Sequence, residues 1–271
     1  MNLFKKAKKK KDTFKKPVEL FSDNWNFYFQ YTTGAFNYSV RYDLAVEKLS
    51  EAVKKDYPHM LQINIPFLNS TENGLPTSEV EFPRLDNIED NFASASTEIR
   101  YFARVAGGNV ARYLFCYNGF ETEKKLQQLV NELVGNLKRN AYSYETIRND
   151  NFATYEQYVL PNNYGKQHML NRSLCQQLQH VGEVFLTPRD IDFLFVFRSD
   201  IHLDKVSANL TEKKFREVRR EKMEDGTYHL EFILNAIPLQ EYMDHITDDI
   251  VDLLENSDGT FDGWGCPVFK E

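Results

Sequence analysis

Alternating apolar and polar positions predict a sheet in the first part of the chain. Residues 24–32 and 35–43 are rich in aromatic and β-branched side chains and flank Gly34, a pattern typical of an antiparallel hairpin. Residues 44–55 favour a short amphipathic helix, and residues 59–68 alternate apolar with polar side chains as a third strand does. Three strands are therefore predicted before the first long helix.

The first long helix has two candidate starting points. Asn73–Pro76 is a turn sequence, and Ser78 and Glu81 have the spacing of a helix-capping box. Pro83 costs a hydrogen bond unless it lies near a helix start, so we expect the helix to begin between residues 78 and 83.

A second hairpin, a helix and one more strand complete the first half. Gly107-Gly108 is a strong hairpin signal. The elements around it are strands over 98–106 and 109–118, a helix over 120–138 and a strand over 141–150. This order, βββ-α-ββ-α-β, is typical of a mainly antiparallel sheet covered by helices.

The second half has its own pattern, which follows a Pro/Asn/Gly linker at 161–165. A helix is predicted over 168–181, with an apolar stripe formed by Leu170, Leu174, Leu178 and Val181. The later elements are a strand over 190–198, a helix over 200–213, strands over 215–223 and 227–236 around Asp225-Gly226, a helix from Pro238 to about residue 256, and a short strand between Gly259 and Gly263. Without its leading helix this is the βαββαβ order of a ferredoxin-like fold.

The predicted fold class is therefore α+β, with two domains that are each a mainly antiparallel sheet covered by helices. We expect a Lys-rich flexible leader at 1–17, an α+β domain at 18–160 and a ferredoxin-like domain at 161–271. The oligomeric state does not follow from these patterns.

Charge separates the leader from the rest of the chain. Residues 1–16 contain eight Lys and one Asp, whereas the whole chain of 271 residues has a net charge of −7. An acidic body repels phosphate backbones, so no stable nucleic-acid complex is expected. The leader is interpreted as a solvated appendage, with transient contact to RNA or an anionic membrane as the alternative.

Cysteine spacing and hydropathy indicate a cytoplasmic protein. Cys116, Cys175 and Cys266 stand far apart, which favours reduced thiols over a disulfide framework or a zinc site. The longest apolar runs are far shorter than a membrane span, and the basic N-terminus is not followed by the apolar core of a secretory signal.

Motifs of catalysis are not found in the sequence. The six histidines lack metal-ligand spacing, and there is neither a Gly-rich phosphate loop nor a Gly-x-Ser-x-Gly elbow. We therefore expect no catalytic residues, no metal, no cofactor and no enzymatic activity. The alternative is an uncharacterised hydrolase or nucleotide-binding enzyme in the N-terminal domain, with a Cys116 nucleophile only if a base lies near it.

The helix predicted to begin at Pro238 contains the main candidate site. Its expected buried stripe is Leu239, Met243, Ile246, Ile250, Leu253 and Leu254. Its acidic residues are Glu241, Asp244, Asp248, Asp249, Asp252 and Glu255, and no Lys or Arg occurs from residue 223 to residue 269. Such a face either keeps the protein soluble or docks a protein partner with a basic surface. A divalent metal is disfavoured, because carboxylates along one helix do not wrap an ion.

Trp264 and Asp262 belong to a glycine-rich segment near the end of the chain. Trp264 stands between Gly263 and Gly265, which favours a core position that closes the second domain. The alternative is contact with a partner, since tryptophan is over-represented among interface hot spots, and both residues are therefore included in the candidate partner-binding set.

The second half resembles the B-type regulators of ribonuclease E activity. The resemblance lies in Phe261-Asp262-Gly263-Trp264-Gly265, Gln177–Gly182, Thr187-Pro188-Arg189 and the acidic helix before the final segment. The resemblance implies a small bacterial ribonuclease inhibitor with a ferredoxin-like fold. Such a protein binds its endonuclease and has no catalytic machinery. The partner that the resemblance suggests is ribonuclease E.

The first half resembles domain-of-unknown-function family 695 across roughly residues 18–160. The residues that carry this resemblance are Trp25–Phe29, the turn Asn73–Pro76, Ile88-Glu89-Asp90, Arg104 and the strand Tyr113–Tyr117. The family has no assigned activity, so the resemblance implies a fold and not a function.

Overall fold

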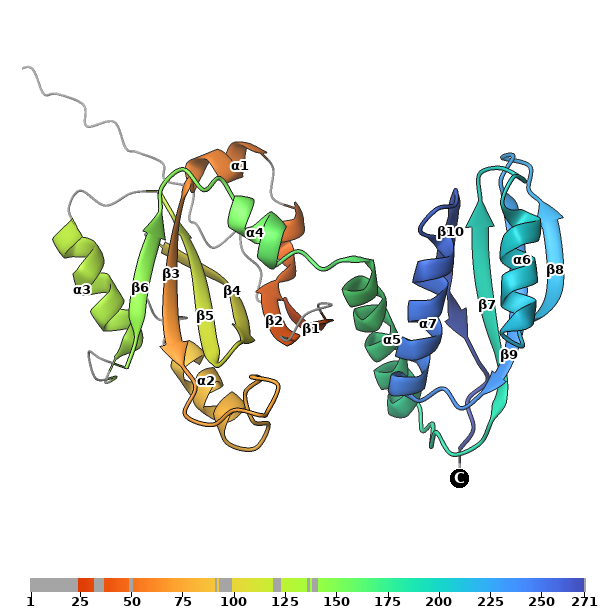
Figure 1. Ribbon diagram of the computed structural model, residues 1–271, viewed down its shortest axis with the longest axis horizontal. Coiled ribbons are helices and arrows are strands. Elements are labelled where there is room, and N and C mark those ends of the chain that lie inside the picture. Colours follow the sequence, from red (N-terminus) through yellow and green to blue (C-terminus); the bar gives the residue numbers. More distant parts are fainter. Residues whose placement is uncertain are drawn as a thin grey trace, which may run out of the picture. The chain divides into compact units, whose positions relative to one another are not determined.

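The chain forms two compact units, Met1–Leu160 and Pro161–Glu271 (Figure 1). The structure, a computed structural model, describes residues 24–31, 37–48, 51–90, 92, 99–118, 123–135, 137 and 141–270. The expected leader at 1–17 and the expected turn at Gly34 lie outside these residues. Within the described ranges, no helix is both long enough and apolar enough to cross a membrane.

The N-terminal unit contains a six-stranded sheet whose neighbouring strands are all antiparallel. Its strands are β1 (Trp25–Tyr31), β2 (Asn37–Asp43), β3 (His59–Pro66), β4 (Ile99–Gly107), β5 (Val110–Tyr117) and β6 (Ser143–Ile147). Their order across the sheet is β1-β2-β4-β5-β3-β6. The two predicted hairpins are confirmed as β1–β2 and β4–β5.

Helices of the N-terminal unit are shorter than the sequence predicts. They are the 3-10 helix η2 (Leu44–Lys48) and the α-helices α1 (Glu51–Asp56), α2 (Glu81–Asp90), α3 (Glu123–Val134) and α4 (Ala153–Tyr158). The helix expected over 44–55 is divided between η2 and α1. Helix α4 was not predicted, because six residues are too few for helical periodicity to show.

Helix α2 starts inside the expected interval, but the predicted capping box is wrong. The backbone N–H of Glu81 donates to Thr77 Oγ1 at 3.3 Å, so Thr77 and not Ser78 supplies the hydroxyl. The fully buried Glu81 carboxylate pairs with Arg84 and accepts the backbone N–H of Asn69 at 3.1 Å. Glu81 therefore anchors the loop before the helix as well as the helix itself.

The β4–β5 turn lies one residue later than predicted. Gly107 pairs with Val110, which leaves Gly108 and Asn109 as the two turn residues. Their φ angles are +62° and +65°, and a two-residue hairpin loop of this kind needs positive φ at both positions. Asparagine tolerates that conformation better than most residues with a side chain, so Gly108-Asn109 fits this turn.

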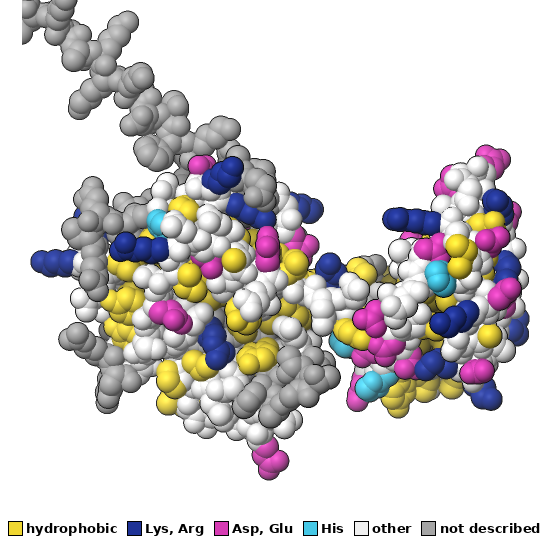
Figure 2. Space-filling view, turned by 45° about the horizontal axis from the view of Figure 1, so that its top comes forward, with side chains coloured by type: hydrophobic (Ala, Val, Ile, Leu, Met, Phe, Trp, Pro, Cys, Tyr) yellow, Lys and Arg dark blue, Asp and Glu magenta, His cyan; other side chains and the backbone are white. Residues whose placement is uncertain are grey.

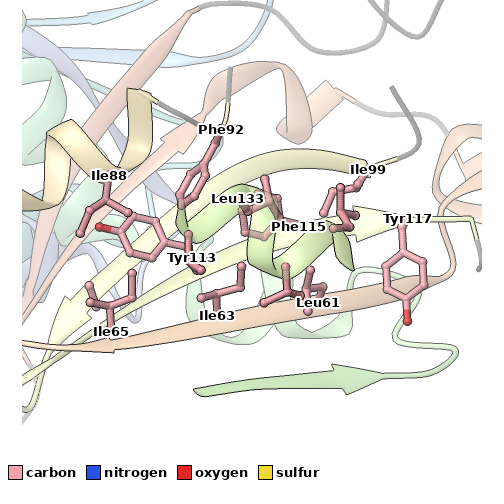
Figure 3. Close-up of a cluster of buried hydrophobic side chains, with 14 of the residues drawn as sticks. Leu61, Ile63, Ile65, Ile88, Phe92, Ile99, Tyr113, Phe115, Tyr117 and Leu133 are labelled. Atoms are coloured by element: carbon pink, nitrogen blue, oxygen red, sulfur yellow. The ribbon is translucent and has the colours of Figure 1, made fainter. Parts of the chain in front are cut away.

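One face of the six-stranded sheet forms the main core of this unit. Leu61, Ile63 and Ile65 on β3 and Tyr113 and Phe115 on β5 point to the same face, where they pack beneath α2 and α3 (Figure 3). This two-residue alternation is the one that the sequence shows at 59–68.

The opposite face is covered by α4 at one end. Tyr28 and Tyr42 pack edge to face, and Phe102 packs against Phe152 and Tyr155. The buried Tyr28 hydroxyl donates to the backbone oxygen of residue 159 at 2.9 Å. Helix α4 is thereby fixed to the sheet, while the strands beyond it carry more polar side chains on this face.

The C-terminal unit has a ferredoxin-like topology, which confirms the predicted α+β class. Its elements are α5 (Asn163–His180), β7 (Arg189–Phe197), α6 (Leu203–Glu212), β8 (Arg216–Lys222), β9 (Tyr228–Ala236), α7 (Gln240–Leu254) and β10 (Gly259–Gly265). The sheet order is β10-β7-β9-β8, with every neighbouring pair antiparallel. Helix α5 precedes this βαββαβ core and packs against α7.

Helix α5 differs from its prediction at both its start and its buried face. The Asn162 side chain accepts the backbone N–H of Gly165 at 2.9 Å, so residues 163–165 form the first turn of the helix rather than a linker. Leu170 and Val181 of the predicted stripe are 63% and 50% exposed. Leu174 and Leu178 pack in the core as predicted, and the buried side also contains Asn171, whose polar group finds partners described below.

The buried stripe of α7 is only partly as predicted. Met243 and Ile250 are buried, and Ile246, Leu253 and Leu254 pack against the core from partly buried positions. Leu239 was predicted to be buried in the helix, but it precedes the helix and is 38% exposed. Thr247, which was not part of the predicted stripe, is fully buried. Thr247 is tolerated there because its hydroxyl donates to the backbone oxygen of Met243 at 2.8 Å.

Strand β8 is an edge strand composed almost entirely of charged residues. Six of its seven residues are charged, in the sequence REVRREK. Arg220 contacts Asp204 and Glu217, and Arg219 contacts Glu221 and Glu231. Charges of this kind are a known device for preventing a sheet edge from pairing with another strand.

We propose that the two units are independent domains that meet at the Leu160–Pro161 junction. Limited proteolysis is expected to cut near residues 159–162, because Leu160 and Asn162 are exposed and belong to no helix or strand. Mass spectrometry of the fragments checks this expectation. A single resistant core that spans the junction would contradict it.

Candidate protein-binding surface

Three of the six predicted acidic residues of α7 contact α5. Asp244 accepts from Asn171 Nδ2 at 2.8 Å, and Asp248 Oδ1 lies 2.7 Å from His168 Nε2. Asp252 accepts from the Tyr164 hydroxyl, and this hydrogen bond raises the pKa of Tyr164 to about 12. Asp244, Asp248 and Asp252 therefore form a polar seam between two helices, a role that the i,i+4 spacing alone does not reveal.

Asn171 is the centre of the seam and is fully buried. Its Nδ2 atom donates to Asp244 and, at 2.8 Å, to Thr247 Oγ1. Its Oδ1 atom accepts from Trp264 Nε1 at 2.9 Å and from Gln167 Nε2 at 3.0 Å. One amide thus joins α5, α7 and β10, and its full hydrogen-bonding capacity is used, as a buried polar group requires.

Trp264 occupies a core position rather than an exposed one. Its side chain is 8% exposed and belongs to the apolar core of the unit, on the sheet face that packs against the helices. The indole N–H, which a buried tryptophan must satisfy, reaches Asn171. Contact of Trp264 with a partner therefore requires that part of the core open.

The remaining acidic residues of α7 point outward. Glu241, Asp249 and Glu255 are exposed, and Figure 2 shows acidic side chains gathered near histidines on the side of the unit that carries α5 and α7. The sequence near α7 contains no Lys or Arg, but Lys213, which is distant in sequence, pairs with Asp249 at 2.6 Å. Glu241 and Glu255 form no ion pair with any residue that the structure describes.

Asp262 lies apart from the α7 residues. It is exposed on β10 and lines a shallow groove of about 480 Å³ together with Asp192, Leu194 and Glu231. These side chains alternate with Phe193, which faces the helices, so the groove is on the open face of the sheet. The eight predicted partner-binding residues thus occupy three places: an inter-helix seam with Trp264 behind it, the outer side of α7, and the open sheet face.

A buried ion pair closes the end of this unit. Arg189 and Glu183 form a two-bonded pair, and both are buried. Glu183 also accepts the backbone N–H of Phe269 at 2.7 Å, and Arg189 donates to the backbone oxygen of Pro267 at 2.9 Å. The hydrogen bonds from Arg189 lower the pKa of Glu183 to about 2. The Thr187-Pro188-Arg189 segment therefore fastens the C-terminal strand extension.

The N-terminal unit contains a second buried ionic cluster, centred on Glu89. Arg41 Nη1 lies 2.6 Å from Glu89 Oε1, and Arg104 Nη1 lies 2.9 Å from Glu89 Oε2. Burial raises the pKa of Glu89, while the two arginines oppose that rise. The cluster ties α2 to β2 and β4. Glu89 Oε1 accepts a hydrogen bond from Arg41, whereas the buried Oε2 lies in ion contact with Arg104 without a hydrogen bond.

The thiols show no sign of activation. Burial raises the pKa of Cys116 well above its usual value, and burial raises that of Cys175 to about 12. A thiolate nucleophile needs the opposite shift. Among the described residues, no group of three His, Cys, Asp or Glu side chains is placed to hold a metal ion.

Fold and surface together define a two-unit α+β protein with a ferredoxin-like second unit and an acidic outer helix. The chain belongs to the family of unknown function 695 (DUF695), whose model matches residues 23–160, about half of its length. Residues 168–266 match the model of the family described as regulator of ribonuclease activity B. Both resemblances inferred from the sequence are confirmed.

Comparisons with individual proteins add little. No curated protein matches the chain. A solved structure assigned as a glycine cleavage system transcriptional repressor aligns with 77% of this chain and 98% of its own, at 6% identity and a TM-score of 0.23. A likeness at that level supports no conclusion about fold or function.

Proposed function

We propose that the C-terminal unit regulates a ribonuclease of the ribonuclease E type by binding to it, and that it acts by contact without catalysis. The observation that supports this most directly is the match of residues 168–266 to the regulator family, because these residues span almost the whole ferredoxin-like unit. A cytoplasmic, bacterial setting is part of the same proposal.

We propose further that the outer side of α7 meets a basic surface of the partner. Glu241 and Asp249 on α7 and the C-cap residue Glu255 are exposed, and of these three only Asp249 has a neighbouring cation among the described residues. Complementary charge mainly accelerates association, and unpaired exposed carboxylates provide that effect without the cost of breaking ion pairs. Asp244, Asp248 and Asp252 are less available, since each bonds to α5.

Reversal of two charges on α7 tests this surface. The double variant Glu241→Lys, Glu255→Lys is expected to slow association with purified ribonuclease E by about tenfold or more at low salt. Its stability should change by less than about 0.5 kcal/mol per site, because both side chains are exposed. The measurement is surface-immobilised binding kinetics over a salt series, in which the wild-type association rate should fall as salt rises.

The matched control is Glu72→Lys, Glu79→Lys, which makes the same change of net charge at exposed positions of the N-terminal unit. An equal effect of both double variants would show a response to net charge rather than a docking surface. Tight wild-type binding, with an association rate that changes neither with salt nor in either double variant, would place the interface elsewhere. Absence of binding by the wild type would leave the family match as evidence of fold alone.

A further inference from the structure

A hollow in the N-terminal unit lies outside the proposed function. It occurs on the face of the six-stranded sheet opposite α2 and α3, beside α4, and has a volume of about 600 Å³. The described residues that line it are Gln30, Tyr38, Gln62, Val105, Arg112, Leu114, Thr154, Gln157 and Tyr158. Its volume falls within the range of roughly 300–1,000 Å³ that is usual for small-molecule sites.

The hollow has an apolar floor and aromatic sides. Leu114 and Val105 belong to the buried floor, on the central strands β5 and β4. Tyr38 comes from β2, and Tyr158, which is 54% exposed, comes from α4. An apolar floor flanked by phenol rings suits a flat ring, since rings gain free energy from both apolar burial and face or edge contacts.

Arg112 is the one charged residue among the described residues that line the hollow. In the sheet it lies between Asn64 of β3 and Val105 of β4. Its guanidinium makes a single long hydrogen bond, 3.3 Å from Nη1 to the backbone oxygen of Gly107, and it has no carboxylate partner among the described residues. Arg41 and Arg104 on the other face, by contrast, are both paired with Glu89.

Gln62 faces the hollow with a defined polarity. Its Nε2 atom donates to Asn64 Oδ1 at 2.8 Å and to Glu145 Oε1 at 2.7 Å, which uses both amide hydrogens. Its Oε1 atom therefore remains to accept a hydrogen bond. The hollow thus combines a fork of guanidinium donors with a fixed amide acceptor, and both are carried by adjacent strands rather than by loops.

We propose that this hollow binds a small planar organic ligand that carries one anionic group. The ring packs on Leu114 and Val105 against the two tyrosines, the anionic group bonds to Arg112, and a ring N–H donates to Gln62 Oε1. Planar carboxylates and phosphates are the groups that the guanidinium fork binds with two parallel hydrogen bonds. A single guanidinium balances a single charge, which favours one such group per ligand.

Calorimetric titration of the full chain tests the proposal and separates the two anion types. Orotate presents a ring carboxylate, and uridine monophosphate presents a phosphate on the same kind of ring. Uracil and inorganic phosphate each supply one half of the recognition. We expect orotate or uridine monophosphate to bind at least about tenfold more tightly than uracil and inorganic phosphate, because ring and anion act together. Tighter binding of orotate would identify a carboxylate as the preferred anionic group, and tighter binding of uridine monophosphate would identify a phosphate.

Variants locate the binding. Arg112→Met keeps the aliphatic stem and is expected to weaken binding by about tenfold or more, while Arg148→Met, an exposed arginine outside the hollow, should leave it unchanged. Tyr158→Ala should weaken the planar ligands and not inorganic phosphate. An unchanged melting temperature shows that each variant folds. Absence of binding by both ring anions at millimolar concentration, or binding that ignores Arg112→Met, would overturn the proposal.

Discussion

Replacement of Trp264 by alanine is expected to lower the free energy of unfolding of the C-terminal unit by roughly 3–5 kcal/mol. The indole is almost fully buried among the residues of the unit's core, and its removal leaves a cavity that the surrounding strands fill only in part. The loss also deprives Asn171 Oδ1 of one of its two donors. Urea unfolding followed by circular dichroism measures the change.

A second variant separates cavity from hydrogen bond. Trp264→Phe retains most of the apolar contact and removes the indole N–H, so it should cost less than the alanine variant. Because Asn171 Oδ1 keeps Gln167 Nε2 as a donor, the lost hydrogen bond itself should cost about 0.5–1.5 kcal/mol. An alanine variant that unfolds like the parent would show that the core does not depend on this residue. Such a result would instead favour a role for Trp264 in contact with a partner.

Replacement of Arg189 by methionine is expected to destabilise the C-terminal unit by about 3–5 kcal/mol, because it leaves the buried Glu183 carboxylate without its partner. The double variant Glu183→Gln, Arg189→Met should recover part of that loss, since glutamine remains an acceptor for the backbone N–H of Phe269 without being charged. Urea unfolding of the two variants against the wild type measures both effects.

The same pair predicts a definite dependence on pH. The pKa of Glu183 is lowered in the folded state from 4.5 to about 2. Between these two pH values the folded protein therefore binds fewer protons than the unfolded protein. Its contribution to stability is therefore complete above about pH 4.5 and is lost as the pH falls toward about 2. The stability difference between wild type and the double variant should shrink across that window. A constant difference would mean that Glu183 does not titrate there.

Sequence patterns predicted the strands better than the helices. Strand alternation at Leu61, Ile63 and Ile65 depends on a strict two-residue repeat, which one buried face imposes directly. The stripe predicted for α5 was half right: Leu174 and Leu178 pack in the core, but Leu170 and Val181 are exposed, and the polar Asn171 is buried where the pattern placed no buried residue. No hydropathy pattern identifies a buried asparagine, since its burial depends on partners from α7 and β10 that are distant in sequence.

The candidate surface shows the same limit. Six acidic residues on one predicted helix suggested a single face, yet the structure assigns Asp244, Asp248 and Asp252 to bonds with α5. Spacing along a helix tells which residues share a side, but not what that side contacts. Contact with α5 separates Asp244, Asp248 and Asp252 from Glu241 and Glu255, and that contact is visible only in the folded structure.

The charged edge strand β8 bears on how copies of this protein would assemble. A new strand added beside β8 would have to place its side chains next to the charges of Arg216, Arg219 and Glu221. Growth of one continuous sheet from molecule to molecule is therefore opposed on this side, so fibre formation and strand-swapped pairing are disfavoured. A concentrated solution of the C-terminal unit is accordingly expected to stay free of ordered aggregates seeded at this edge.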